Sequence, residues 1–144
     1  MPDFTRAPRE VRDLADWLRD HGYEPQHDAP GGEFNQFVVL GNANVRVAIR
    51  ADRGDWDVTL SIDEGRRYWQ IDQLEAYLEG CPWVGDPSSD LHKASFVKTR
   101  VAELEQRVHD DPEAYATLLR IGDEWMSWRF GIPIPDGGFP RGLE

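Results

Sequence analysis

The stretch RVAIRADRGDWDVTLSI, residues 46–62, alternates apolar with polar or small residues on both sides of an Arg-Gly-Asp triplet. A period of two on each side predicts two half-buried β-strands. Residues 51–55 lie between the strands and include Gly54, which accepts positive φ at no steric cost. The stretch therefore predicts an antiparallel hairpin with a three- to five-residue loop. The apolar positions that define the two strands are Val45, Val47 and Ile49, then Trp56, Val58, Leu60 and Ile62.

The charged residues around the triplet are typical of a turn, because a glycine supplies the bend and its neighbours keep the tip hydrated. On the polar face, Arg46 and Arg50 lie on a strand opposite Asp55 and Asp57. Opposite charges facing one another across strands contribute about 0.2–1 kcal/mol per pair. We expect such pairs to help set the register of the hairpin.

The segments around the hairpin complete a sheet preceded by a helix. Residues 34–40 predict a strand before it, and residues 66–70 a further strand after it. Residues 8–22 predict an amphipathic helix. Its apolar stripe consists of Val11, Leu14, Ala15 and Leu18. The expected sheet is a three- to four-stranded antiparallel meander.

Three helices are predicted after the sheet, over residues 71–80, 90–109 and 112–130. Asp72 followed by Glu75 predicts a capping box for the first of them, and Gly80 its end. We expect an α+β fold in one domain, residues 1–144, with the three helices packed on one face of the sheet. Residues 131–144 form a Pro/Gly-rich tail that is either laid over the core by Ile132, Ile134 and Phe139 or a disordered end, and its apolar residues favour the first alternative.

Composition narrows the classes of function. The chain has 27 acidic and 16 basic residues, a formal net charge of −11 at pH 7, and this charge repels nucleic acid and anionic membranes. Cys81 has no second cysteine, and no signal segment or membrane-length apolar run is present, so a cytoplasmic protein is expected. The four histidines are far apart, and we expect no metal site and no cofactor.

Motifs for catalysis are also missing from the sequence. No serine stands in a Gly-x-Ser-x-Gly elbow, and neither glycine pair precedes a helix with the lysine of a phosphate-binding loop. We assign no catalytic residue and expect a binding protein. Of the six tryptophans, Trp56 and Trp125 are expected in the core, whereas Trp83 lies in a loop, either facing a partner or folded back as a plug.

VRVAIRADRGDWDVTLSI, residues 45–62, followed by YWQIDQLEAYLEG, residues 68–80, resembles the small acidic α+β immunity proteins encoded beside polymorphic toxins in actinobacteria. The resemblance covers roughly residues 11–80. It implies a bacterial toxin inhibitor, a cytoplasmic protein that binds a cognate toxin with a basic surface in a stoichiometric protein–protein interaction. The contact residues expected on this basis are Trp69, Trp83, Asp86, Asp90, Asp63 and Glu64.

A second class of function stays open. The chain is alternatively a small enzyme or ligand-binding domain, with a pocket between the sheet and the helices formed by aromatic walls and one or two carboxylates. An accessory subunit is a third reading.

Overall fold

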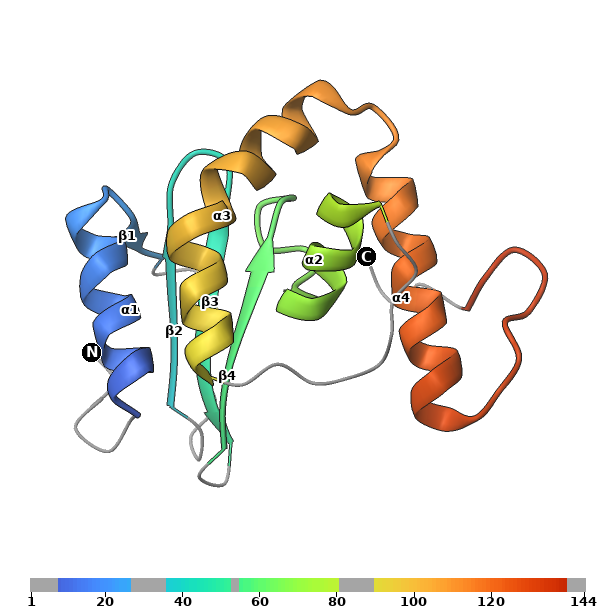
Figure 1. Ribbon diagram of the computed structural model, residues 1–144, viewed down its shortest axis with the longest axis horizontal. Coiled ribbons are helices and arrows are strands. Elements are labelled where there is room, and N and C mark those ends of the chain that lie inside the picture. The colour runs from blue at the N-terminus through green and yellow to red at the C-terminus, as the bar shows by residue number, and fades with distance from the viewer. Residues whose placement is uncertain (1–7, 27–35, 53–54, 81–89, 140–144) are drawn as a thin grey trace.

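The structure is a computed structural model that describes residues 8–26, 36–52, 55–80 and 90–139. It has the predicted α+β fold, with a helix, an antiparallel sheet and then three helices (Figure 1). In chain order the elements are α1 (Arg9–Asp20), β1 (Glu24–Pro25), β2 (Gln36–Gly41), β3 (Arg46–Asp52), β4 (Asp55–Ser61), β5 (Trp69–Gln70), α2 (Ile71–Glu79), α3 (Asp90–Asp110) and α4 (Ala114–Phe130).

The sheet is a meander in the order β1-β2-β3-β4-β5, and every neighbouring pair is antiparallel. The described residues form five strands where three or four were predicted: β5 falls within the possible fourth strand at residues 66–70, and the two-residue strand β1 is the one that was not predicted. Directly opposed residues of antiparallel strands point to the same face. Val47 lies opposite Leu60, and Ile49 opposite Val58, so the alternating apolar residues form one buried face.

The hairpin loop is shorter than predicted. Asp52 pairs with Asp55, so two residues rather than three to five connect β3 and β4; these two, Arg53 and Gly54, lie outside the described residues. The loop length was predicted from the point where the apolar alternation stops. Strand pairing continues past that point, as far as Asp52 and Asp55. Arg50 does face Asp57 across the strands, but the Asp57 carboxylate forms its ion pair with Lys93 of α3, at 3.0 Å.

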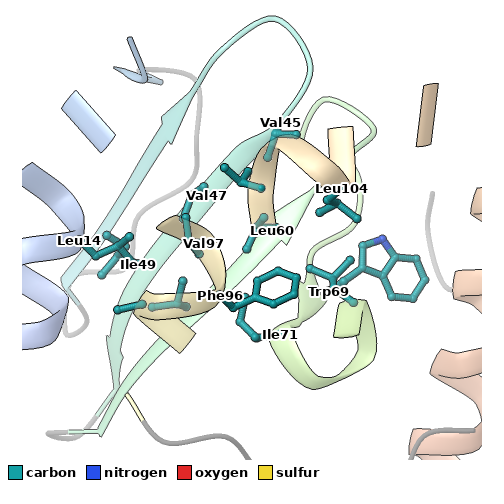
Figure 2. Packing of buried hydrophobic residues seen from close by; sticks show 14 of the residues in the cluster. Leu14, Val45, Val47, Ile49, Leu60, Trp69, Ile71, Phe96, Val97 and Leu104 are labelled. Atoms are coloured by element: carbon teal, nitrogen blue, oxygen red, sulfur yellow. The ribbon is translucent and has the colours of Figure 1, made fainter. Parts of the chain in front are cut away.

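The core lies where α1 and α3 cover the apolar face of the sheet (Figure 1). Leu14 of α1 lies against Ile49 in Figure 2, and Val97 of α3 lies over Val47 and Leu60. The predicted stripe of α1 is fully buried. The prediction that all three later helices pack on the sheet is wrong for α4, which packs mainly against α2 and lies on the far side of α2 from the strands in Figure 1.

The start of α2 also differs from the prediction. The N-cap is Gln70, and its side chain and that of Gln73 form a capping box, whereas Asp72 and Glu75 had been expected in these roles. The helix begins directly after β5, which places Ile71 in the core. The helix ends at Gly80 as predicted, with φ of 64°.

Candidate functional site

Trp69 was predicted to contact a partner, but it is 2% exposed and belongs to the hydrophobic core. The reason is its register in the sheet: Trp69 lies opposite Leu60 and therefore shares the buried face. Figure 2 shows its indole extending from the core toward α4. A Cβ atom at Gly122 of α4 would lie 3.2 Å from the Trp69 ring, so this glycine allows the helix to approach. The structure thus corrects the prediction that Trp69 lies at an exposed surface.

Asp63 and Glu64 lie in the turn between β4 and β5, and their side chains have different roles. The Asp63 carboxylate accepts hydrogen bonds from the Ser61 hydroxyl at 2.7 Å and from the Arg67 backbone N–H at 3.1 Å. These bonds hold the turn. Glu64 is exposed and has a φ of 61°, which is uncommon for a residue with a side chain. Of the two, Glu64 is the one presented to solvent.

The other three predicted contact residues are close together in the sequence. Trp83 and Asp86 lie outside the described residues, and Asp90 is the first residue of α3.

A cavity of 220 Å³ lies between the end of the sheet, α2 and α4. We refer to it as the Trp69 cavity. Its lining consists of Arg67, Tyr68, Trp69, Gln70, Gln73, Leu119, Gly122, Asp123, Trp125, Met126 and Phe139. Trp125, predicted in the core, is half-buried and lines the cavity instead of filling it. Sequence reasoning did not single out this group, since its members come from three separate stretches of the chain, residues 67–73, residues 119–126 and Phe139.

Asp123 is a buried polar residue of the Trp69 cavity, with 5% of its surface exposed. Its carboxylate accepts a hydrogen bond from the Phe139 backbone N–H at 3.2 Å. This bond returns the chain after α4 to the middle of that helix, as Figure 1 shows. The sequence did not indicate a role for the adjacent residues Asp123 and Glu124, because neighbouring acidic residues are common by chance in so acidic a chain.

Beyond α4 the chain exposes apolar side chains. Trp128, Phe130, Ile132 and Ile134 have exposed fractions between 45% and 57%. We call residues 128–134 the exposed apolar segment. The prediction that Ile132 and Ile134 lie over the core is therefore wrong; of the three residues named for that role, Phe139 is the one that lines the Trp69 cavity. The prolines and the left-handed Gly131 turn the chain away from the core before it returns (Figure 1).

A second cavity, of 440 Å³, lies between the β2–β3 turn, the β4–β5 turn and α3, and Glu64 is part of its lining. Glu105 of α3 lies in the same lining and accepts hydrogen bonds from Tyr23, Asn42 and Asn44. Burial, followed by the charge of Glu105, raises the pKa of the Tyr23 hydroxyl above its ordinary value. These bonds tie α3 to the sheet, so this side of the cavity has a structural role.

The described residues contain no group of three or more histidine, cysteine or acidic side chains that could hold a metal ion. None of the described helices has the length and hydrophobicity needed to cross a membrane. Comparison of the chain with known protein families, with curated proteins and with solved structures found no match. The features of the described residues that could bind another molecule are the exposed apolar segment, the Trp69 cavity and the second cavity.

Proposed function

We propose that the chain is an immunity protein, which neutralises a cognate protein toxin with a basic surface by direct stoichiometric association in the bacterial cytoplasm. The observation that carries the proposal is the exposed apolar segment, four large apolar side chains within seven residues that stay in contact with solvent. Exposed apolar groups gathered in one place are typical of binding surfaces. Aromatic residues among them are typical of the side chains that contribute most binding energy.

The segment is held in place by bonds within the chain. Gly131 ends α4 in the left-handed conformation, the Gly138 N–H donates to the Pro135 carbonyl at 2.9 Å, and the Phe139 N–H donates to Asp123. A loop closed at both ends loses less conformational entropy when it binds. This arrangement supports a role for Trp128 and Phe130, at the end of α4, as anchors for a partner.

The charge of the chain supports the choice of a basic partner. A formal net charge of −11 creates a field that attracts a cationic protein and speeds its encounter. Glu64 is exposed and is retained as a proposed contact, together with Trp83, Asp86 and Asp90. Trp69 is removed from the proposed contacts because it is buried.

The experiment is co-purification with the protein encoded by the neighbouring gene, at micromolar concentration and low salt. We expect a one-to-one complex that weakens as salt increases. Changing Phe130→Ala and Ile134→Ser together should weaken the complex by at least about tenfold, as expected for loss of an interface anchor. The matched control is Ala116→Ser, which replaces an exposed apolar residue near the start of α4, outside the exposed apolar segment and the proposed contacts.

Two outcomes would contradict the proposal. One is the absence of a complex under these conditions. The other is a complex that the double variant and the control weaken equally, because the exposed apolar segment would then have no special role.

A further inference from the structure

The second cavity, between α3 and two turns of the sheet, has the size of a binding site and is accessible from solvent. Its volume is 440 Å³, and ligand sites typically measure about 300–1,000 Å³. Asn44 and Glu64 in the turns and His109 of α3 are exposed members of its lining. We call it the Glu64 cavity.

The fixed charges of the Glu64 cavity are negative. Glu64, from the β4–β5 turn, and Glu105, from α3, both belong to the lining, and the described part of the lining contains no lysine or arginine. Two carboxylates without a basic residue beside them attract a cation and repel an anion. The charge of the lining therefore selects a cationic ligand.

The two carboxylates differ in the contacts that they already make. Three neutral donors hold the Glu105 carboxylate: Tyr23 and Asn42, each at 3.1 Å, and Asn44 at 3.4 Å. These donors fix the carboxylate without cancelling its charge. Glu64 forms no hydrogen bond or ion pair within the described part of the chain. One carboxylate is thus held in place, and the other is available to a ligand.

The walls beside the carboxylates are partly apolar, since Val45, Ile62 and Val108 belong to the lining. Long cationic side chains lay their methylene groups along apolar surface while the charged end reaches a polar group. Such walls favour an organic cation with a hydrocarbon chain. A metal ion is a poorer fit, because the described residues contain no group of three or more side chains that could hold one.

A guanidinium group suits two carboxylates better than an ammonium group does. Its five N–H donors form a planar fork that bonds carboxylate oxygens in pairs, whereas an ammonium is a compact and strongly hydrated charge. We propose that the Glu64 cavity binds a guanidinium group, and that its natural occupant is an arginine side chain on the basic surface of the partner. The second clause rests on the proposed function and names the contact that Glu64 makes there.

The first experiment titrates three small probes into the full chain at low salt and pH 8, where a histidine is ordinarily uncharged. The probes are n-butylguanidinium, n-butylurea, which has nearly the same shape but no charge, and n-butylammonium. We expect butylguanidinium to bind at least about tenfold more tightly than butylurea, because charge-assisted hydrogen bonds are the stronger ones. Butylammonium should bind less tightly than butylguanidinium. In a proton–nitrogen NMR spectrum, the Asn44 side-chain amide signals should move as butylguanidinium binds, since Asn44 lines the cavity.

Two variants and a control locate the binding. Glu64→Gln removes a charge without breaking a described contact, and we expect it to weaken butylguanidinium binding at least about fivefold. Ala102→Trp, at an exposed position of the lining, fills the cavity and should abolish binding. Glu113→Gln is the matched control, because it removes the same charge from an exposed residue beside α4 that lies outside the lining. It should leave the affinity unchanged.

The guanidinium site is overturned by any of three results. Butylguanidinium fails to bind at millimolar concentration, it binds no more tightly than butylurea or butylammonium, or its affinity is the same in Glu64→Gln as in Glu113→Gln. Binding that survives Ala102→Trp likewise places the probe outside the cavity and overturns the proposal.

The second experiment uses the complex with the protein encoded by the neighbouring gene. Glu64→Gln should weaken this complex at least about fivefold more than Glu113→Gln does, because only Glu64 contacts the arginine of the partner. If the two variants weaken the complex equally, the partner places no arginine in the cavity, although the proposed function stands. If no complex forms, the proposed function fails and the partner's arginine with it, whereas the probe titrations still decide the guanidinium site.

Discussion

The half of the molecule formed by α1, the sheet and α3 differs from the half formed by α4 and the segment after it. In the first half, the apolar residues that recur with strand or helix periodicity are buried, as Leu14, Ile49 and Val97 are. In the second half, α4 packs mainly on α2, and Trp128 to Ile134 are exposed. The apolar residues of the first half stabilise the fold. In the second half, Leu118 and Ile121 of α4 are also buried, whereas the large apolar residues of the exposed apolar segment are in contact with solvent.

The largest expected effect tests this difference directly. Leu60→Ala removes a side chain that is 0% exposed and should lower the free energy of unfolding by about 2–5 kcal/mol. Ile134→Ala, in the exposed apolar segment, should lower it by less than about 0.5 kcal/mol. Urea unfolding followed by circular dichroism measures both. Similar losses in the two variants would show that the segment belongs to the core.

A smaller effect tests a polar link of the first half. The Asp57 carboxylate accepts hydrogen bonds from the Lys93 ammonium at 3.0 Å and from the Val58 N–H at 2.9 Å. The two charged side chains are 25% and 14% exposed, so Asp57→Ala leaves a largely buried ammonium without its ion-pair partner. We expect a loss of about 1–3 kcal/mol in unfolding free energy.

A double-mutant cycle of Asp57→Ala with Lys93→Met separates the ion pair from the other contacts of Asp57. If the two losses simply add, the ion pair contributes nothing, and the first half depends on apolar burial alone.

Within the second half, Asp123→Ala removes the acceptor of the Phe139 N–H. We expect a global loss of about 1 kcal/mol and faster hydrogen exchange at the Phe139 amide. Asp123→Asn keeps an acceptor oxygen and is the matched control. Unchanged exchange at Phe139 in the alanine variant would mean that the loop is held by other contacts.

The smallest effect appears only at alkaline pH. The pKa values of Tyr23 and Tyr77 are raised, first by burial and then by their contacts with Glu105 and Asp111 respectively. In the unfolded chain, a tyrosine loses its proton near pH 10. Above this pH, ionisation stabilises the unfolded state before the folded state, so the contribution of both residues is complete below pH 10 and falls as the pH rises.

Unfolding free energies measured from pH 8 to 11 test this dependence. The variant Tyr23→Phe with Tyr77→Phe should show a smaller decrease above pH 10 than the wild type. An equal decrease would mean that other groups cause it.

Several features of the fold follow from local patterns that the chain carries in its sequence. The strands around Val47 and Leu60, the helix stripe of Val11 and Leu18, and the end of α2 at Gly80 agree with the prediction, because periodicity and capping depend on neighbouring residues. The hairpin length and the N-cap of α2 were predicted wrongly. Both depend on how far strand pairing extends, which is a property of two segments together.

The sequence by itself determined the α+β class, the positions of its main elements and the strong negative charge, since alternation, helical spacing and residue counts need no tertiary contact. Only the tertiary structure decided that Trp69 is buried, that Asp123 receives the Phe139 N–H, and that the segment after α4 exposes its apolar residues. The physical reason is distance along the chain. Burial and hydrogen bonding at these positions depend on residues brought together from β5, α2, α4 and the C-terminal segment. A local sequence pattern does not predict which of these distant residues come into contact.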